Sequence, residues 1–230
     1  MSARERILGR GSELSEQTIS WVQKRIAANG CVFFEPWVER VAEVGLQFTV
    51  PPTGAPILEG ITPLLTDSIG SYLGSRIAPE PAPDGCWLPA IEIGLRLAAQ
   101  AQEMGYFGPL GIDAVRYRDS SREIRLRPLQ DVNARFTMGR ISLGLRRLLN
   151  PGEAASWLHV RPSSTTNSSP HSWYDQLVRG LPESVRAIPT SPFLLAERPI
   201  AHGTLLVVAT NSAELEQAEK VILGARYQRG

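Results

Sequence analysis

The sequence predicts an α+β protein (mixed α/β) with a largely antiparallel sheet flanked by helices. Helix-like and strand-like segments alternate irregularly along the 230 residues. Two strand-like stretches, 111–117 and 125–133, are separated only by a short polar turn, which is typical of an antiparallel hairpin. Hydrophobic residues make up 43% of the chain and charged residues 20%, so the composition is that of a globular protein with a core.

The first predicted element is a helix over residues 12–28. Ile19, Val22 and Ile26 recur at helical spacing. Ser15 has a side chain that can accept a hydrogen bond from the first turn, so we expect it to cap the helix.

The next part of the chain predicts strands and loops. CVFF, residues 31–34, predicts a strand that stops at Pro36, because proline cannot donate to a sheet ladder. VGLQFTV, residues 44–50, predicts a second strand that ends at the turn PPTGAP. Residues 58–86 are rich in Gly, Pro and Ser and predict loops with short elements.

The rest of the chain predicts four further helices, one further strand and one polar loop. We expect the helices at 88–105, 140–149, 173–180 and 212–226, the strand at 203–210, and the loop at 161–172.

The bulk properties exclude several classes of protein. The net charge of +1 gives no whole-chain field that would draw the protein to nucleic acid or an anionic membrane. Two cysteines without CxxC spacing argue against a zinc site or a disulfide framework. The first residues lack the apolar region of a signal peptide, and the longest apolar runs are too short to span a bilayer. We therefore expect a cytoplasmic protein.

Four polar residues of the predicted hairpin point to a metal–phosphate site. Asp131, Asn133 and Arg135 alternate along one strand and so share one face, and pairing of the two strands puts Asp113 beside Asp131. Two carboxylates and an amide oxygen suit Mg²⁺ or Mn²⁺. Mg²⁺ held by few protein ligands usually shares its shell with phosphates, and an arginine adds a bidentate phosphate donor. This group predicts a Mg–nucleotide site.

A simpler interpretation of the same residues remains open. Asp131 and Asn133 can be strand-end or turn residues, and Asp113 can pair with Arg116 or Arg135. A carboxylate inside an apolar strand needs such a partner, because burying an unpaired charge is unfavourable.

The order G-x-D-x-x-x-Y, turn, strand and D-x-N-x-R resembles the metal-binding hairpin of the ATP-grasp family, which includes D-alanine–D-alanine ligase and biotin carboxylase. The resemblance implies that Asp113, Asp131 and Asn133 hold Mg²⁺ on the phosphates of ATP. It also implies that Arg135 contacts the transferred phosphate or the acyl-phosphate. The sequence departs from the family pattern at Asp131, where Glu is usual, so the number of metals bound is in doubt.

Residues 31–50 resemble the hinge strand of the same family, where the backbone faces adenine. The resemblance assigns the adenine pocket to Glu35, Trp37 and Val38, and the ribose to Glu43 or Glu39. The simpler interpretation of Glu35-Pro36-Trp37 is a strand end with a half-buried tryptophan.

The resemblance covers only the C-terminal ATP-binding portion of the family. The N-terminal lobe of the family carries a lysine on a strand and a glycine-rich flap, whereas here about 30 residues precede the hinge and Lys24 lies in a predicted helix. We expect three segments: a helical segment at 1–29, a remnant of the other lobe; the ATP-grasp C-terminal lobe at 30–150; and a loop with a small strand–helix cap at 151–230.

The expected function is that of the ATP- and Mg²⁺-binding part of a carboxylate–amine or carboxylate–thiol ligase. Such an enzyme activates a carboxylate as an acyl-phosphate, which an amine or thiol then attacks. Expected partners are ATP, a carboxylate and an amine of unknown identity, and a partner chain that supplies the N-terminal lobe or a second copy of this chain. The alternative is a degenerate, non-catalytic lobe that acts as an interaction or regulatory module.

Overall fold

The computed structural model describes residues 14–32, 38–67, 70–77, 85–161, 170–192, 194–195, 198–199 and 202–227. The chain divides into two compact units, Met1–Val38 and Glu39–Gly230.

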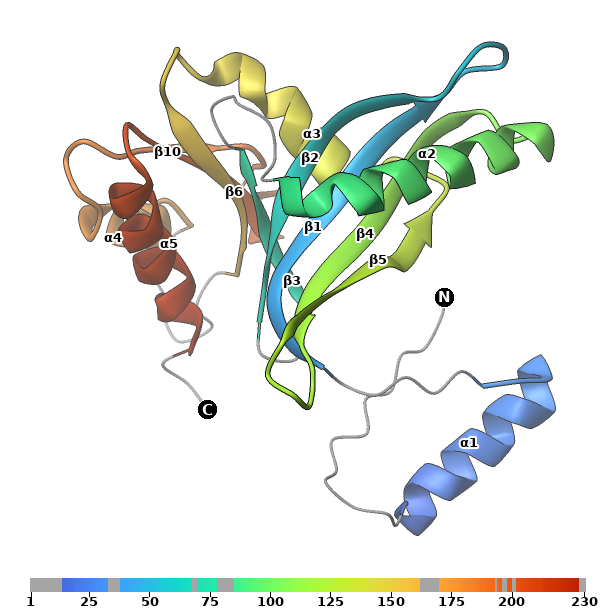
Figure 1. Ribbon diagram of the computed structural model, residues 1–230. Helices are drawn as coiled ribbons and strands as arrows, with labels where there is room; N and C mark the ends of the chain where they lie inside the picture. Colours follow the sequence, from blue (N-terminus) through green and yellow to red (C-terminus); the bar gives the residue numbers. More distant parts are fainter. Residues whose placement is uncertain are drawn as a thin grey trace. The chain divides into compact units, whose positions relative to one another are not determined.

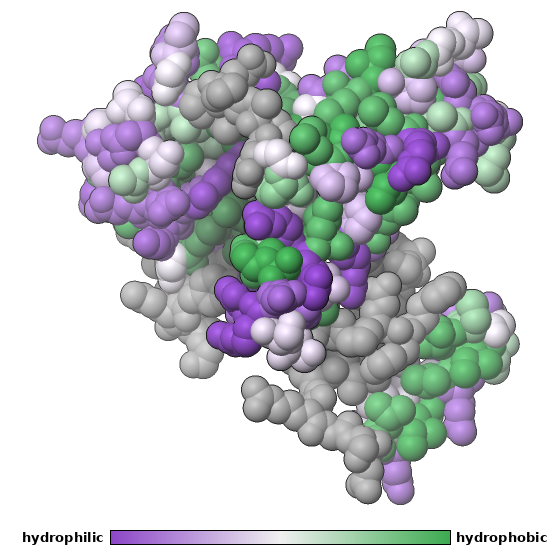
Figure 2. All heavy atoms as spheres, in the orientation of Figure 1, coloured by the Kyte–Doolittle hydropathy of each residue, from purple (hydrophilic) through white to green (hydrophobic). Residues whose placement is uncertain are grey.

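The first unit contains one helix, α1, Glu16–Asn29. The Ser15 side chain accepts a hydrogen bond from the Thr18 backbone N–H at 3.2 Å, so the predicted cap is confirmed. The helix ends at Gly30, whose φ of 82° is a conformation that glycine adopts readily. No residue of α1 is buried, and hydrophobic surface is visible on this helix in Figure 2.

The second unit is built on an eight-stranded sheet in the order β5-β4-β1-β2-β3-β6-β10-β7 (Figure 1). All of its strand pairs are antiparallel, so the predicted fold class is confirmed. The strands are β1 Glu39–Val50, β2 Ile57–Thr66, β3 Tyr72–Ile77, β4 Gly108–Arg118, β5 Ile124–Asn133, β6 Ala154–Val160, β7 Arg186–Pro189 and β10 Gly203–Ala209. A separate two-stranded pair consists of β8 Leu194–Leu195 and β9 Arg198–Pro199.

Helices cover both faces of this sheet. They are η1 Gly85–Trp87, α2 Leu88–Glu103, α3 Met138–Leu145, η2 Arg146–Leu148, α4 Pro170–Arg179 and α5 Ser212–Tyr227. Helix α2 packs on β1, β4 and β5, and α5 packs on β6 and β10 (Figure 1). Ile61 packs against the buried residues under α2, and Leu65 packs against those under α5. Because these two residues point to the same side of β2, both helices lie on one face of the sheet. Helix α3 covers the other face, over β1, β2 and β3.

Strand β1 shows why one face of the sheet is a core. Val44, Leu46 and Phe48 alternate along the strand, are buried, and pack with Ala90 and Ala98 of α2. Small residues on this side of α2 let the helix approach the sheet closely. The intervening residues of β1 point to the α3 face, which is therefore where the polar positions of the strand lie.

The prediction of loops over residues 58–86 is wrong, because this stretch holds most of β2 and all of β3. Its glycine content suggested turns, but glycine is also required where two chains approach closely. A side chain at Gly74 would place its Cβ 2.4 Å from the backbone oxygen of Trp157 in the neighbouring strand. The composition of this stretch therefore reflects tight strand packing in the sheet.

Most of the other predicted elements are present. The helices predicted at 88–105, 140–149, 173–180 and 212–226 and the strand at 203–210 are α2, α3 with η2, α4, α5 and β10. In the predicted strand 31–34, Cys31 and Val32 are not in a strand, and Phe33 and Phe34 lie outside the described residues.

The sheet runs across the predicted segment boundary at residue 150. Strands β6, β7 and β10 come from the segment 151–230 and continue the sheet that β1 to β5 begin. The division into 30–150 and 151–230 stays a prediction about domain organisation. None of the helices in the described ranges is long and apolar enough to cross a membrane.

Candidate functional site

The centre of the candidate site is a pair of carboxylates on adjacent strands. Asp113 of β4 is the direct cross-strand partner of Asp131 of β5, and Gly111 is the partner of Asn133. Directly paired residues of an antiparallel ladder point to the same face, with Cβ atoms about 5 Å apart. Ile112 lies between the two pairs and faces the α2 core, so the two aspartates and Asn133 lie together on the α3 face.

Glycines leave room around this pair. Gly45 of β1 is the partner of Asp113 on its other side, and a Cβ at Gly45 would lie 3.6 Å from Asp113 Oδ1. The start of α3 reaches the same place, since a Cβ at Gly139 would lie 2.5 Å from both Gln47 Nε2 and Thr62 Oγ1. We call this surface the polar face: the α3 side of β1, β2, β4 and β5, which carries Asp113, Asp131, Asn133, Gln47 and Thr62.

Arg135 lies directly beside the amide of Asn133. Its Nη2 donates to Asn133 Oδ1 at 2.9 Å, and its Nη1 donates to the Phe136 carbonyl at 3.1 Å. The guanidinium is otherwise exposed. The structure therefore brings all four predicted hairpin residues together, with Arg135 hydrogen-bonded to the oxygen that the resemblance assigns to the metal.

The predicted ribose ligand, Glu43, lies on the polar face of β1 but its carboxylate already has protein contacts. It accepts a hydrogen bond from Arg40 Nη1 at 2.5 Å and one from the Thr66 hydroxyl at 3.4 Å. Its side chain is 9% exposed. The other acid considered, Glu39, pairs with Arg118 at 3.2 Å.

The three residues predicted for adenine are only partly described. Val38 is half-buried and belongs to the first unit. Glu35 and Trp37 lie outside the described residues. The adenine pocket therefore stays a prediction.

Tyr72 of β3 is a neighbour of the carboxylate pair that the sequence did not indicate. Its hydroxyl and Ser75 Oγ form a 2.7 Å hydrogen bond. The centroids of the Tyr72 and His159 rings are 5.1 Å apart, and the two rings are nearly perpendicular. Burial raises the pKa of Tyr72 to about 12; the hydrogen bond with Ser75 opposes this rise and the negative charge of Asp113 adds to it. Tyr72 was missed because its strand was predicted as a loop, and only the pairing of β2 with β3 brings it to this face.

The alternative pairing of Asp113 with Arg116 is not supported by the direction of the side chains. Asp113 and Arg116 are three positions apart in a strand and so point to opposite faces. Arg116 Nη1 donates to Cys86 Sγ at 3.3 Å on the α2 side.

The donor set of the polar face fits a hard divalent cation. Within the described ranges, no group of three or more His, Cys, Asp and Glu residues could hold a metal ion. The oxygen donors at the carboxylate pair are two carboxylates and one amide. This set suits Mg²⁺, because Mg²⁺ can complete its shell with water and phosphate oxygens.

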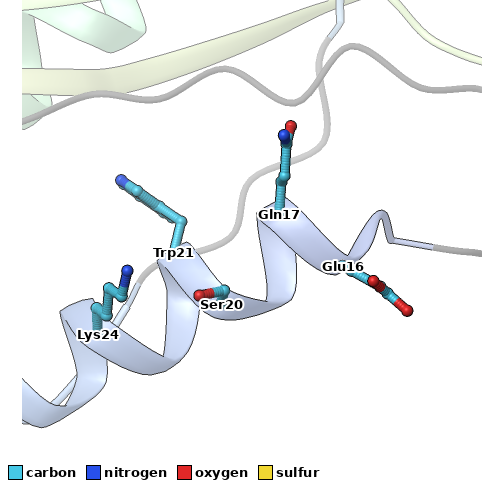
Figure 3. A pocket seen from close by; sticks show the side chains of 5 residues that line it. All are labelled: Glu16, Gln17, Ser20, Trp21 and Lys24. Atoms are coloured by element: carbon cyan, nitrogen blue, oxygen red, sulfur yellow. The ribbon is translucent and has the colours of Figure 1, made fainter.

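A hollow lies along α1 in the first unit. Figure 3 shows the five side chains that line it, all from this one helix: Glu16, Gln17, Ser20, Trp21 and Lys24. The side chains project at different angles and do not converge on a common point in Figure 3. We therefore do not assign a ligand to this hollow.

The structure resembles solved enzymes, although neither a protein-family model nor a curated protein matches the chain. The N5-carboxyaminoimidazole ribonucleotide synthetase from Thermus thermophilus is 15% identical with a TM-score of 0.52, over 91% of this chain and 57% of that one. The ADP complex of the same kind of synthetase, purK, is 14% identical with a TM-score of 0.50, over 93% and 57%. The synthetase from Staphylococcus aureus is 8% identical with a TM-score of 0.50, over 83% and 52%.

These synthetases are ATP-grasp enzymes, so the predicted resemblance to the ATP-grasp fold is confirmed. At these identities the similarity concerns the fold and not the activity. The chain spans 57% of the length of the first two solved structures.

Proposed function

We propose that this chain is the ATP- and Mg²⁺-binding part of an ATP-grasp ligase. The ligase would activate a carboxylate as an acyl-phosphate, which an amine or a thiol then attacks. The observation that carries the proposal is the direct cross-strand pairing of Asp113 with Asp131, with Asn133 on the same face beside them.

The electrostatics of this pair favour a cation. Two neighbouring carboxylates on one face attract a divalent cation more strongly than either carboxylate does alone. Mg²⁺ bound through one or two carboxylates usually takes further oxygens from nucleotide phosphates. Asp113, Asp131 and the Asn133 amide oxygen would hold the metal, and the bound metal would neutralise charge on the phosphates.

Arg135 would act on the phosphoryl group itself. It is exposed and lies beside Asn133, so its guanidinium is next to the place where the phosphates would lie. A guanidinium is planar and binds phosphate oxygens through two parallel hydrogen bonds. Since phosphoryl transfer depends mainly on positioning and charge neutralisation, this residue would stabilise the charge of the transferred group.

The nucleoside would extend from this site toward the start of β1. Glu43 lies two residues from Gly45 on the polar face, about 7 Å along the strand. We propose Glu43 as the ribose ligand, and Glu35, Trp37 and Val38 as the adenine contacts. Binding of ribose by Glu43 would compete with its hydrogen bonds from Arg40 and Thr66.

A complete nucleotide grip would need residues beyond this sheet. We propose that a partner chain, or a second copy of this chain, supplies the second lobe. The alternative is a non-catalytic lobe that serves as an interaction or regulatory module. Two hydrogen bonds favour this alternative: Arg135 donates to Asn133, and Arg40 donates to Glu43. The side chains of both predicted ligands are therefore already hydrogen-bonded within the protein.

Calorimetric titration of the full chain with ATP, with and without Mg²⁺, tests the proposal. The variants are Asp131→Ala and a control, Glu123→Ala, which removes an acid at the turn of the same hairpin. We expect Mg²⁺-dependent binding that Asp131→Ala abolishes and Glu123→Ala preserves. Binding that is independent of Mg²⁺ or insensitive to Asp131→Ala would overturn the metal site, and the absence of binding to the wild type would favour the non-catalytic lobe.

A further inference from the structure

The chain that joins β5 to α3, residues 134–137, carries Arg135 and returns to the sheet within four residues. We call it the β5–α3 connection. It leaves β5 after Asn133, which lies opposite Gly111 of β4. It comes back over the same glycine, because a Cβ at Gly111 would lie 2.3 Å from Thr137 Cγ2. Both ends of the connection are therefore set beside Gly111, and Arg135 lies between them.

The far end of the connection is held by Gln47 from the middle of β1. Thr137 Oγ1 donates to Gln47 Oε1 at 2.6 Å. Gln47 is the cross-strand partner of Gly111 on the side away from Asn133, so Gln47 and Asn133 flank this glycine on the polar face. Gln47 is 2% exposed. Loss of a hydrogen bond by a buried amide costs free energy, so the contact with Thr137 favours one position of the connection.

Three glycines make room for the Gln47 side chain. A Cβ at Gly45 would lie 2.8 Å from Gln47 Nε2, and one at Gly139 would lie 2.5 Å from the same atom. A Cβ at Gly111 would lie 3.4 Å from Gln47 Oε1. The carboxamide therefore fills a space bounded by β1, β4 and the first turn of α3. A side chain that is packed on several sides has little freedom to change its rotamer.

The hydroxyl of Thr137 joins α3 to β1. It accepts a hydrogen bond from the Arg140 backbone N–H at 3.2 Å and so caps α3, and it donates its own hydrogen to Gln47. A hydroxyl can do both at once, because it has one hydrogen and two lone pairs. The start of α3 and the middle of β1 are thereby fixed to each other.

Arg135 makes its own hydrogen bonds to neighbours in the chain. Its backbone N–H donates to the Asn133 carbonyl at 2.8 Å, and its guanidinium donates to Asn133 Oδ1 and to the Phe136 carbonyl. These acceptors lie within two residues of Arg135, so these bonds do not fix the far end of the connection on the sheet. The bond between Thr137 and Gln47 does.

We propose that Gln47 and Thr137 are positioning residues for Arg135. They hold the β5–α3 connection on the sheet, so that the guanidinium stays beside Asn133. The role of Arg135 at the phosphoryl group rests on the proposed function, whereas its positioning can be measured without metal or nucleotide. Positioning matters for such a group, because a misplacement of about 1 Å can cost about a hundredfold in rate.

The first test is Gln47→Met, which keeps an unbranched side chain and removes the acceptor for Thr137. The Thr137 hydroxyl can still cap α3 through the Arg140 N–H. Without ligands, we expect a fall in the ¹⁵N heteronuclear NOE of residues 134–136. The control is Thr49→Val, two residues further along the same face of β1. It removes the 2.7 Å hydrogen bond from Arg140 Nη2 and should leave these NOE values unchanged.

A size swap at Gly111 tests the same contact and leaves Gln47 in place. Gly111→Ala would place its Cβ 2.3 Å from Thr137 Cγ2 and so displace the connection. Thr137→Ser removes that methyl and keeps the hydroxyl, and the next atoms near the new Cβ are 3.4 Å away. We expect Gly111→Ala to lower the NOE values of residues 134–136, and the double variant with Thr137→Ser to restore them. A general loss of stability would not be reversed by Thr137→Ser.

A double-mutant cycle tests whether Gln47 acts through Arg135. We expect Gln47→Met and Arg135→Gln each to weaken Mg-ATP binding about tenfold, as for one lost charge-assisted hydrogen bond. The double variant should be no weaker than Arg135→Gln alone, because residues that act as a unit are not additive. Calorimetry measures these affinities, and the affinity of Gln47→Met for free Mn²⁺ should equal that of the wild type.

Three results would overturn the positioning role: unchanged NOE values in Gln47→Met, no rescue of Gly111→Ala by Thr137→Ser, or additive losses in the cycle. A wild type that does not bind Mg-ATP while the NOE results hold would contradict the proposed function and leave the positioning of Arg135 supported. The two failures are therefore seen separately.

Discussion

Asp113 and Asp131 are direct partners across the β4–β5 ladder, so two carboxylates lie side by side on the polar face of the sheet. The same ladder places Asn133 opposite Gly111, where the partner strand has no side chain to cover it. The arrangement depends on register, because a shift of one residue would turn Asp131 to the α2 side. From the turn the ladder runs to Val115 opposite Arg127, and a register shift between Asp113 and Val115 then brings Asp131 opposite Asp113, so this irregularity is part of the site.

Arg135→Gln should separate binding of the metal from binding of the nucleotide. The substitution removes the hydrogen bond to Asn133 Oδ1 and so frees this oxygen, while it also removes a phosphate donor. We expect free Mn²⁺ to bind at least as tightly as in the wild type, and Mg-ATP to bind about tenfold more weakly, as for one lost charge-assisted hydrogen bond. Calorimetry with each ligand measures both effects, and Mg-ATP affinity equal to that of the wild type would exclude this role for Arg135.

Asp119 organises the turn between β4 and β5. Its Oδ1 accepts hydrogen bonds from the Ser121 and Glu123 backbone N–H groups and from the Ser121 hydroxyl, and its Oδ2 accepts one from Arg125. The Ser121 hydroxyl, followed by Arg125, lowers the pKa of Asp119 to about 2. Because the pKa is lower in the folded state, the stabilisation is present above the unfolded value of 3.8 and is lost as the pH falls toward 2.

Ser121→Ala should therefore move the pKa of Asp119 up toward 3.8. A carboxyl ¹³C NMR titration measures this shift directly. Ser120→Ala, one residue earlier in the same turn, is the matched control and should leave the titration of Asp119 unchanged. Equal titration curves for Ser121→Ala and the wild type would contradict the role of the hydroxyl.

Glu219 of α5 joins the helix to the sheet through an ion pair with Arg76 in which the carboxylate is the buried partner. Its side chain is 7% exposed and accepts hydrogen bonds from Arg76 at 2.8 and 2.6 Å and from the Ser156 hydroxyl at 2.5 Å. Glu219→Ala leaves Arg76, whose side chain is 35% exposed, without this acceptor, so we expect a loss of about 2 kcal/mol in the free energy of unfolding, as for a lost charge-assisted hydrogen bond. Urea denaturation measures it.

Glu216→Ala is the control for this helix. Glu216 also lies near Arg76, at 3.6 Å, but its side chain is 51% exposed. Exposed ion pairs contribute little, so the free energy of unfolding should change by less than about 1 kcal/mol. Similar losses for the two variants would mean that burial of Glu219 does not matter.

The sequence predicted the helices and strands that depend on residues close together in the chain. Helix α1 follows from apolar spacing and the Ser15 cap, and the β4–β5 hairpin follows from a short polar turn between two strands. Strands β2 and β3 were missed because their glycines serve close packing against other strands, such as Gly74 against Trp157. That packing depends on residues far away in the chain, which composition cannot reveal.

The same distinction applies to the site. Asp113 and Asp131 could be brought together by prediction because they lie on the two strands of one short hairpin, although the register shift that makes them direct partners is visible only in the structure. Thr62, Tyr72 and Arg140 reach the polar face only through β2, β3 and α3, whose positions are set by non-local pairing. The contacts of Glu43 with Arg40 and Thr66 are likewise visible only in the folded chain.

The most direct test of the central claim is to locate a bound divalent cation with Mn²⁺. Paramagnetic broadening of NMR signals at low Mn²⁺ should select the Asn133 side-chain amide and the backbone amides of Ile112 and Val132, and Mg²⁺ should reverse it. Asp131→Asn should abolish the effect. Broadening centred on the acidic turn at Asp119 and Glu123, or broadening at Asn133 that survives Asp131→Asn, would contradict a metal site at the carboxylate pair.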